Sequence, residues 1–382
     1  MTAATPTHEV VTDPGIDGLV AAATRLCNAR PHDTQIAVFV AEGDAPDLSA
    51  LVVALETALE GRPFFGGLFP QVIDGATTHL RGGLVVALPA HGRPVVMTGR
   101  EVPELLSPTG PALAFVLVDG LARNITGYLE GLYDRLGNAV SYWGGGAGTS
   151  DLQSKPCVFC NDGVFADAAV VALAPVAADL GVRHGWTQFV GPFVATRTRG
   201  NEILELNWES AFEVYGRALA EDVGGVMTPT AFSDVAAGYP FGIQKHGEEP
   251  VVRDPIAVGS AGSLICVGDV PENAALMVLR GTAERLIEAA AAAATDACRT
   301  ACKARLSLVA DCVSRSAFLG DRFGEELSAM QTASAAQSET LWQVGVLTLG
   351  EISSYGHAYL ELFNKTAVVA SVPVEGPTPG QQ

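Results

Sequence analysis

Short apolar runs alternate with amphipathic stretches along most of the chain. Residues 35–41 (QIAVFVA) form an apolar, β-branched and aromatic run that is typical of a buried strand. Residues 15–28 before it and 49–60 after it carry apolar side chains at helical spacing. The same criteria predict the other elements, with strands at 113–118, 274–278 and 306–313 and helices at 125–136, 205–219, 282–303 and 322–333. This alternation predicts an α/β protein whose sheets are covered by helices.

One layout occurs three times. Residues 63–88, 142–173 and 344–372 each begin with an apolar run, continue through a polar middle and end in a β-rich run. Three copies of strand, loop and returning strand predict a duplicated two-part architecture, with mixed β-sheets covered by helices. In the second copy, Asn161-Asp162-Gly163 predicts a β-hairpin, because these residue types favour positive φ in a tight turn.

Composition narrows the class of protein. The chain has 382 residues, of which 48% are hydrophobic and 17% charged, enough for two globular domains with buried cores. Residues 1–14 and 373–382 are expected to be disordered tails. The formal net charge of −19 repels phosphates, which excludes nucleic acid and anionic membrane surfaces as partners. Because no secretory signal or long apolar segment is visible, we expect a cytoplasmic protein.

Six short motifs together carry a resemblance to a known family. They are Tyr142-Trp143-Gly144-Gly145-Gly146-Ala147-Gly148, His184-Gly185-Trp186, Tyr239-Pro240-Phe241-Gly242 with Arg253 following, Asp311-Cys312-Val313-Ser314-Arg315 with Gly320, Gly350-Glu351-Ile352, and Phe363-Asn364-Lys365-Thr366. In order and spacing they resemble the FIST sensory module, over about residues 30–372. The resemblance implies an N-terminal FIST domain at 30–220 and a C-terminal one at 221–372.

The resemblance also implies a function. FIST proteins are intracellular ligand-sensing or signal-transduction modules and not a known enzyme class. Some bacterial members bind haem, sense nitric oxide, and regulate sensor kinases or cyclic-di-GMP signalling. Two departures limit what carries over, since Gly66-Gly67-Leu68-Phe69-Pro70 replaces a small-polar stretch ending in Gly-Glu-Ile, and Leu362-Phe363 precedes Asn364 where relatives often have a histidine.

We expect a ligand pocket to be lined by three segments, residues 144–151, 312–315 and 350–366. Gly144, Gly145 and Gly146 could bring backbone N–H groups close to an anionic ligand at the pocket rim, near Asp151, although a purely structural glycine loop is equally compatible with the sequence. The remaining candidate ligand-binding residues are Arg253, Arg315, Glu351 and Asn364. Either arginine could bind a haem propionate or another carboxylate in a bidentate manner. The sequence has no nucleophile elbow, zinc-protease motif or P-loop, so we predict no enzyme.

The cysteines suggest a thiophilic metal such as zinc. Cys298 and Cys302 would share one face of the predicted helix at 282–303, and Cys157 with Cys160 could complete a tetrathiolate site if the chain turns there. Cys312 is a further candidate ligand, or lines the pocket. The alternative is that these thiols are free and packed in cores. Because Asn161 follows the Cys157/Cys160 pair, covalent c-type haem attachment is excluded.

A haem would therefore be of the b type, with His357 or His184 as the axial ligand. His357 lies between two tyrosines and beside Gly356, which suggests a ligand-facing loop. For both histidines a structural or solvent-facing role is the alternative.

Three functions remain open from the sequence. The first is a cytoplasmic sensor that binds a small molecule or haem, responds to nitric oxide or redox state, and regulates a partner such as a histidine kinase or cyclic-di-GMP enzyme. The second is a zinc–thiolate redox switch, and the third is an interaction adaptor without a ligand. The oligomeric state stays undetermined.

Overall fold

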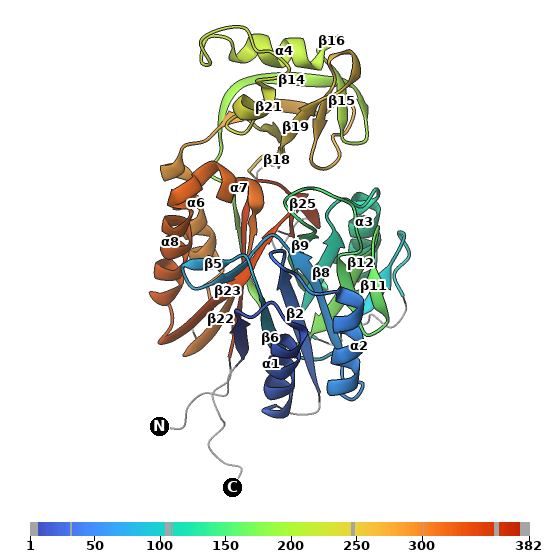
Figure 1. Cartoon of the computed structure of the whole chain (residues 1–382). Coiled ribbons are helices and arrows are strands. Elements are labelled where there is room, and N and C mark those ends of the chain that lie inside the picture. The colour runs from blue at the N-terminus through green and yellow to red at the C-terminus, as the bar shows by residue number, and fades with distance from the viewer. Residues whose placement is uncertain are drawn as a thin grey trace.

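The computed structural model describes residues 7–30, 33–103, 108, 110–245, 249–300, 302–354 and 359–374. A large body holds both ends of the described chain, and a smaller lobe projects from the opposite end (Figure 1). The body contains three six-stranded sheets, and the lobe contains an eight-stranded sheet. The α/β class and the mixed sheets covered by helices are confirmed.

The body consists of three copies of one unit. In each copy two parallel strands are joined by a helical crossover, and a third strand returns antiparallel to the first. The elements are β2 (Thr34–Ala41), α2 (Leu48–Ala58), β3 (Phe64–Phe69) and β6 (Gly83–Pro89) in the first unit, β8 (Ala112–Asp119), α3 (Ile125–Leu136), η1 (Gly137–Ala139), β9 (Val140–Ala147) and β12 (Ala169–Ala174) in the second, and β22 (Ala304–Cys312), α7 (Val313–Leu319), η3 (Gly320–Arg322), α8 (Phe323–Ala335), β23 (Thr340–Thr348) and β26 (Ala367–Pro373) in the third. The three repeats seen in the sequence are thus three structural units.

Each unit gives one hairpin to a neighbouring unit. The hairpins are β4 (Val72–Asp74) with β5 (Thr77–His79), β10 (Val158–Cys160) with β11 (Gly163–Phe165), and β24 (Glu351–Ser353) with β25 (Glu361–Phe363). The first pairs with β23, the second with β3 and the third with β9, so the exchange closes in a ring. Because every sheet contains strands from two units, no unit completes its sheet alone.

Three edge strands complete the sheets. They are β1 (His8–Val11), β7 (Val95–Met97) and β13 (Asp179–Arg183), paired with β6, β12 and β26. The expectation of a disordered tail over residues 1–14 is wrong for residues 8–11. These residues form β1, whose backbone pairs with residues 83–86 of β6. Helix α1 (Ile16–Asn28) buries Leu19 and Leu26 over the first sheet.

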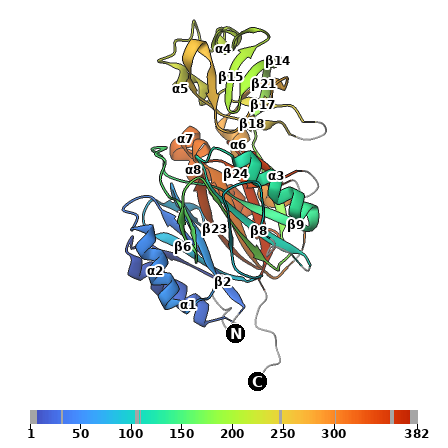
Figure 2. The same cartoon turned by 90° about the vertical axis from the view of Figure 1, so that its right-hand side faces the viewer.

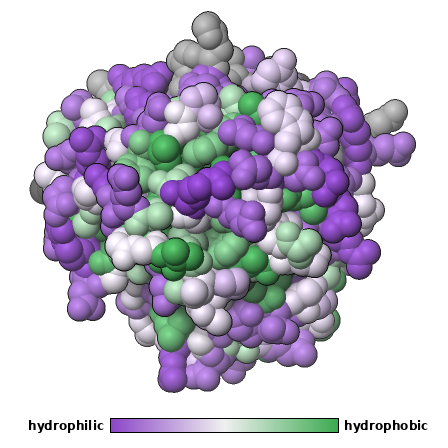
Figure 3. All heavy atoms as spheres, turned by 90° about the horizontal axis from the view of Figure 1, so that it is seen from above, coloured by the Kyte–Doolittle hydropathy of each residue, from purple (hydrophilic) through white to green (hydrophobic). Residues whose placement is uncertain are grey.

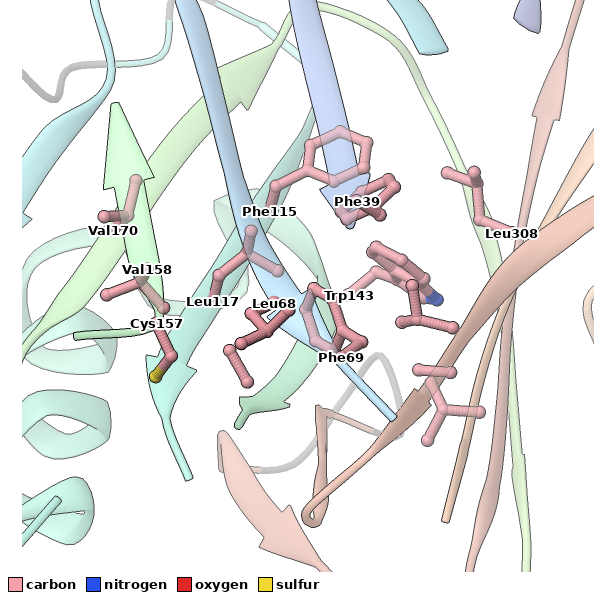
Figure 4. Close-up of a cluster of buried hydrophobic side chains, with 14 of the residues drawn as sticks. Phe39, Leu68, Phe69, Phe115, Leu117, Trp143, Cys157, Val158, Val170 and Leu308 are labelled. Atoms are coloured by element: carbon pink, nitrogen blue, oxygen red, sulfur yellow. The ribbon is translucent and has the colours of Figure 1, made fainter. Parts of the chain in front are cut away.

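The three units meet in one aromatic core. Phe39 of β2, Phe115 of β8 and Trp143 of β9 point toward one another, with Leu308 of β22 nearby (Figure 4). The Trp143 ring lies edge-on to both phenylalanines, at centroid distances of 6.0 and 5.6 Å. Edge-to-face packing of buried rings stabilises such a core beyond the area that it buries.

The lobe is inserted between β13 and helix α6 (Ala283–Asp296). Its elements are β14 (Thr187–Arg199), β15 (Glu202–Leu206), β16 (Glu209–Ser210), α4 (Ala211–Leu219), α5 (Phe232–Ala236), β17 (Phe241–Ile243), β18 (Val251–Arg253), β19 (Pro255–Val258), η2 (Ser260–Gly262), β20 (Leu264–Cys266) and β21 (Ala275–Arg280). Thr187 pairs with Arg280, so the two chain crossings into the lobe lie side by side. The lobe is therefore attached at one place.

Two helices are shorter than the sequence indicated. The helix expected at 205–219 begins at Ala211, because Asn207 and Trp208 adopt positive φ and turn β15 into β16. The helix expected at 282–303 ends at Asp296. Beyond that point Arg305 donates a hydrogen bond to the carbonyl of Ala297, which satisfies an acceptor at the end of the helix.

The outer face of the lobe exposes apolar side chains among polar ones (Figure 3). The side chains of Trp208 and Val226, both in the lobe, are 79% and 92% exposed. No helix within the described residues is long and apolar enough to cross a membrane.

Candidate ligand-binding site

The junction between lobe and body is built around His184, Gly185 and Trp186. Gly185 has a φ of +79°, and a Cβ there would lie 2.6 Å from the carbonyl oxygen of Arg285, so only glycine fits. Directly after β21, which returns the chain from the lobe, a Cβ on Gly281 would lie 2.6 Å from the Trp186 ring. Trp186 is buried, packs edge-on against Phe318, and donates through Nε1 to the carbonyl of Lys365.

A cavity of about 620 Å³ lies between the lobe and the body. In Figure 2 the lobe stands over α3 and β24 on this side of the molecule. The cavity is lined by α3, β25, β17 and β18, together with Arg100, Asp269, Pro271 and Tyr359. Its volume lies in the range of sites that hold small organic ligands.

Most charged groups of this cavity are paired. Arg100 binds the carboxylates of Glu130 and Asp134 at 2.9 and 2.7 Å. Lys245 of the lobe binds Glu361 of the body at 2.6 Å. These pairs are half-exposed, so each contributes little to stability, but they hold charged side chains in fixed places around the cavity.

Arg253 is the buried arginine of the cavity wall. Its Nε donates to the carbonyl of Asp269 at 2.8 Å, and its Nη1 donates to the carbonyls of Val252 and Leu362, both at 3.0 Å. The Leu362 contact joins the lobe to the body. Burial lowers the pKa of Arg253.

Two smaller cavities continue along the junction. One of about 350 Å³ shares Thr126, Asp269 and Leu362 with the large cavity. The other, of about 210 Å³, is lined by Asp254 and Ser314 as well as Lys365, whose Nζ lies 3.2 Å from Asp254. Polar contacts thus extend across the junction, which is typical of interfaces between parts that move.

A fully buried ionic network lies below the junction. Arg315 donates two hydrogen bonds to Glu326 and one each to the carbonyls of His184, Lys365 and Leu286. Its Nε also lies 3.3 Å from the carboxylate of Asp311, which is fully buried. Burial and the neighbouring carboxylate of Glu326 raise the pKa of Asp311 well above its usual range.

Glu351 belongs to the same buried region. Its carboxylate accepts from the Thr348 hydroxyl at 2.7 Å and from the Thr366 amide at 3.1 Å. Burial raises the pKa of Glu351 to about 8 despite these hydrogen bonds. The buried carboxyl groups of Asp311, Glu326 and Glu351 thus lie around the Arg315 guanidinium, and burial favours the neutral forms of Asp311 and Glu351.

Comparison with known protein families agrees with this architecture. The family model of the FIST N domain matches residues 35–209, and that of the FIST C domain matches residues 211–354. The chain belongs to the FIST family. A comparison with curated proteins finds no match. FIST domains are sensory and signal-transduction domains.

In this FIST chain the glycine run is a strand and not a loop. Gly144, Gly145 and Gly146 are buried in β9, and the Gly146 amide donates to the carbonyl of Gly350. A Cβ on Gly144 would lie 1.9 Å from the carbonyl of Val116. The expectation of a loop that offers N–H groups to an anion is therefore wrong, because the sheet uses these groups.

The same close approach occurs once in each unit. Gly66 and Gly345 pair with Val38 and Val309 as Gly144 pairs with Val116, and a Cβ on either would also lie 1.9 Å from the partner's carbonyl oxygen. The glycines are thus explained by the packing of the repeated unit. The alternative of a structural glycine segment fits the geometry.

The other candidate binding residues of the FIST chain are dispersed. Asp151 accepts from Thr149 and from the Gln153 amide in an exposed turn. Asn364 is buried and donates to the Phe363 carbonyl, and its Oδ1 has no hydrogen-bond partner among the described residues. Among the eight candidates, Arg253 lines the large cavity, whereas Arg315 and Glu351 are buried beneath the junction.

Of the two candidate haem ligands, the structure describes His184 but not His357. His184 is buried, its Nδ1 accepts from the Trp186 amide at 2.9 Å, and its Nε2 lies 3.4 Å from Glu249. Burial lowers the pKa of His184 to about 4, so its imidazole is neutral and orients the junction backbone. His357 lies outside the described residues. Tyr359, two positions later, lines the large cavity.

The structure does not bring the cysteines together. Cys298 and Cys302 lie beyond the end of α6, so they do not share a helix face. Cys157 and Cys160 are buried in different surroundings, with Asp119 near the first thiol and Asp162 near the second. Burial raises the pKa of both thiols and of Cys312. Within the described part of the chain, no three His, Cys, Asp or Glu side chains are placed to hold a metal ion. The tetrathiolate prediction is corrected accordingly.

Sequence reasoning missed most of the cavity wall. Thr126, Lys245 and Asp269 come from segments far apart in the chain and carry no local motif, whereas Leu360, Glu361 and Leu362 lie in the segment 350–366 that the sequence predicts to line the pocket. Tyr359 and Arg253 were found, the first because it flanks His357 and the second because it follows a FIST motif.

Proposed function

We propose that this FIST protein is a ligand-responsive sensory module, and that its ligand occupies the 620 Å³ cavity between lobe and body. The observation that carries this proposal is the composition of the cavity wall, which comes from both parts and encloses a buried arginine. A ligand there contacts both parts at once. It therefore favours one arrangement of the lobe over others, which is the condition for a binding event to change output.

The junction is suited to such a change. Both chain crossings lie together, and the lobe meets the body through the ion pair of Lys245 with Glu361 and the hydrogen bond from Thr126 to Asp269. Polar contacts of this kind can be exchanged for water at small cost. A coupling of about 1–3 kcal/mol would alter partner affinity about 5- to 150-fold.

The test measures lobe position directly. Spin labels at Val53 of the body and Trp208 of the lobe, both exposed, would report the distance between the two parts in a Cys302→Ser background. The ligands are hemin, benzoate, phenyl phosphate and benzamide, added separately. We expect at least one to bind and to narrow or shift the distance distribution.

The matched control for this test is Leu129→Trp, which places a larger side chain in the cavity wall. It should abolish both binding and the distance change. Binding that leaves the distance unchanged in the parent protein, or that persists in Leu129→Trp, would contradict the proposal. A cavity that binds none of these ligands would favour the ligand-free adaptor.

Haem b is a second candidate ligand for the same site. It is favoured by the apolar wall, by Arg253 as a partner for a propionate, and by the position of His357 two residues before Tyr359. Hemin added to the apoprotein should give a Soret band that shifts in His357→Ala and again on addition of nitric oxide. An unchanged spectrum in His357→Ala, with normal thermal stability, would remove this assignment.

We propose a signalling protein as the receiver of the response, such as a sensor histidine kinase or a cyclic-di-GMP enzyme. The family resemblance supports this class of partner. Measuring kinase autophosphorylation or cyclic-di-GMP turnover with and without the FIST protein would test it.

A further inference from the structure

Arg253 is a buried cation that has no ion pair in the described part of the chain. It is 7% exposed, and its three hydrogen bonds all go to neutral backbone carbonyls. Its Nη2 donates no hydrogen bond within the described residues, although the side chain lines the 620 Å³ cavity. An unpaired cation removed from water is costly, so such a group needs an anion to compensate it.

The carboxylates of Glu361 and Asp269 lie near enough to favour the charged form of Arg253, but neither forms an ion pair with it among the described residues. Glu361 is bound by Lys245 at 2.6 Å, and Glu130 and Asp134 are bound by Arg100. Asp269 offers Arg253 its backbone oxygen, while its carboxylate accepts from Thr126 at 2.7 Å. The acidic side chains of the wall thus each have another partner, and Nη2 of Arg253 is left without a hydrogen bond within the described part of the chain.

The guanidinium is also held in place. Three carbonyls from β18, the 269 segment and β25 fix its plane, and Gly268 lies against it, where a Cβ would be 3.3 Å from Nε. A preorganised guanidinium loses little entropy when it binds a carboxylate or phosphate. This arrangement is a built recognition group, and not a surface arginine that happens to lie nearby.

The rest of the wall suits an apolar body. Leu129, Leu360 and Leu362 line the cavity, and the Tyr133 and Tyr359 rings lie 5.2 Å apart at its side. We propose that the cavity binds an organic anion, a carboxylate or phosphate monoester with an apolar or aromatic body, and that Arg253 recognises its charged group. This inference rests on the proposed ligand-sensing function and names the ligand class.

The experiment uses three probes of one shape. Benzoate, phenyl phosphate and the neutral benzamide are titrated into the full chain, with ligand-observed NMR and the thermal midpoint as readouts. We expect one or both anions to bind at least about tenfold more tightly than benzamide, since a hydrogen bond to a charged group contributes about 1.5–3 kcal/mol. Which anion binds more tightly distinguishes a carboxylate ligand from a phosphate ester.

Variants then assign the binding to Arg253. Arg253→Gln should weaken anion binding at least about tenfold, and Arg253→Lys should retain part of it because it keeps the charge. Arg217→Gln removes an exposed arginine of the same lobe outside the cavity and should change nothing. Leu129→Trp places a larger side chain in the cavity while leaving Arg253 unmutated, and it remains informative if Arg253→Gln does not fold.

Each result decides between the two proposals. Anion binding that is lost in Arg253→Gln, or in Leu129→Trp if the former does not fold, supports the inference. Equal binding of benzamide and benzoate that only Leu129→Trp abolishes overturns the anion assignment and leaves the sensory proposal standing. Anion binding that survives Leu129→Trp overturns both. No binding of any of these three probes overturns the anion assignment, and the sensory proposal then stands or falls with the binding of hemin.

Discussion

Replacing Arg315 by methionine should destabilise the body more than any surface charge change. The substitution keeps an unbranched apolar side chain but removes the guanidinium. Two of its hydrogen bonds go to Glu326 and three go to carbonyls of three different segments, and Arg315 and Glu326 are fully buried. The variant leaves three buried carboxyl groups, those of Asp311, Glu326 and Glu351, without their cation.

The magnitude follows from this inventory. Removing one partner of a buried ion pair costs about 3–5 kcal/mol, and each carbonyl left unsatisfied adds about 1 kcal/mol or more. A typical domain has about 5–15 kcal/mol of stability, so the variant should lose a large fraction of it. The cost should increase with pH, because burial raises the pKa of Asp311 and of Glu351, so that at low pH these two groups are neutral and need no counter-charge.

Urea unfolding, followed by tryptophan fluorescence and circular dichroism at pH 5.5 and pH 8, measures this cost. The matched control is Arg217→Met, which removes an exposed arginine paired with Glu209 and should cost less than about 1 kcal/mol. Adding Glu326→Gln to Arg315→Met should recover part of the loss. The reasoning is refuted if Arg315→Met is as stable as Arg217→Met, or if its cost does not change with pH.

Three further outcomes are expected. Gly345→Ala should destabilise the protein by about 1–3 kcal/mol or more, because its Cβ would lie 1.9 Å from the Val309 carbonyl, whereas Gly99→Ala has open space and should be nearly neutral; equal midpoints in urea would contradict this. Burial raises the pKa of Glu351 to about 8, so the folded protein holds a proton there that the unfolded chain releases above about pH 4.5. The stability of the protein should therefore fall as pH rises from about 5 to 8. Glu351→Gln should flatten that part of the stability profile, and an unchanged slope would count against the raised pKa. In native protein, Cys302 should be the one cysteine among those described that reacts rapidly with a thiol reagent, since the others are buried, and rapid reaction of several thiols before denaturation would argue otherwise.

The local pattern alone determined much of the fold. Apolar runs placed β2, β8 and β22 to within about two residues at each end, and helical spacing placed α3 at its observed bounds. The predicted hairpin at residues 161–163 is confirmed, although the positive φ falls on Gly163. These features depend on neighbours in the sequence, which is why the sequence reveals them.

The motifs also identified the family, but not the roles of their residues. From the sequence, the Gly144 run is compatible with a ligand loop or with a tightly packed strand. The structure shows a strand, in which Gly144 lies so close to the Val116 carbonyl of the neighbouring strand that only glycine fits. Arg315 and Arg253 are both arginines of FIST motifs, yet one is enclosed by carboxyl groups and the other faces a cavity. The local sequence does not show which distant residues each side chain contacts.

Only the tertiary structure decided how the three units combine. Each donated hairpin pairs with a strand of a different unit, with Gly345 of β23 opposite Ile73 of β4 although 272 positions separate them. Helix α6 ends at Asp296, and Arg305 of the next strand donates a hydrogen bond to the carbonyl of Ala297 just beyond it. Cys298 and Cys302 lie after this end, so they do not share a helix face as the sequence predicts. The cavity likewise exists only because the inserted lobe lies over α3 and β25. A sequence specifies which residues prefer a strand, a helix or a turn, whereas the contacts between distant segments depend on the packing of the whole chain.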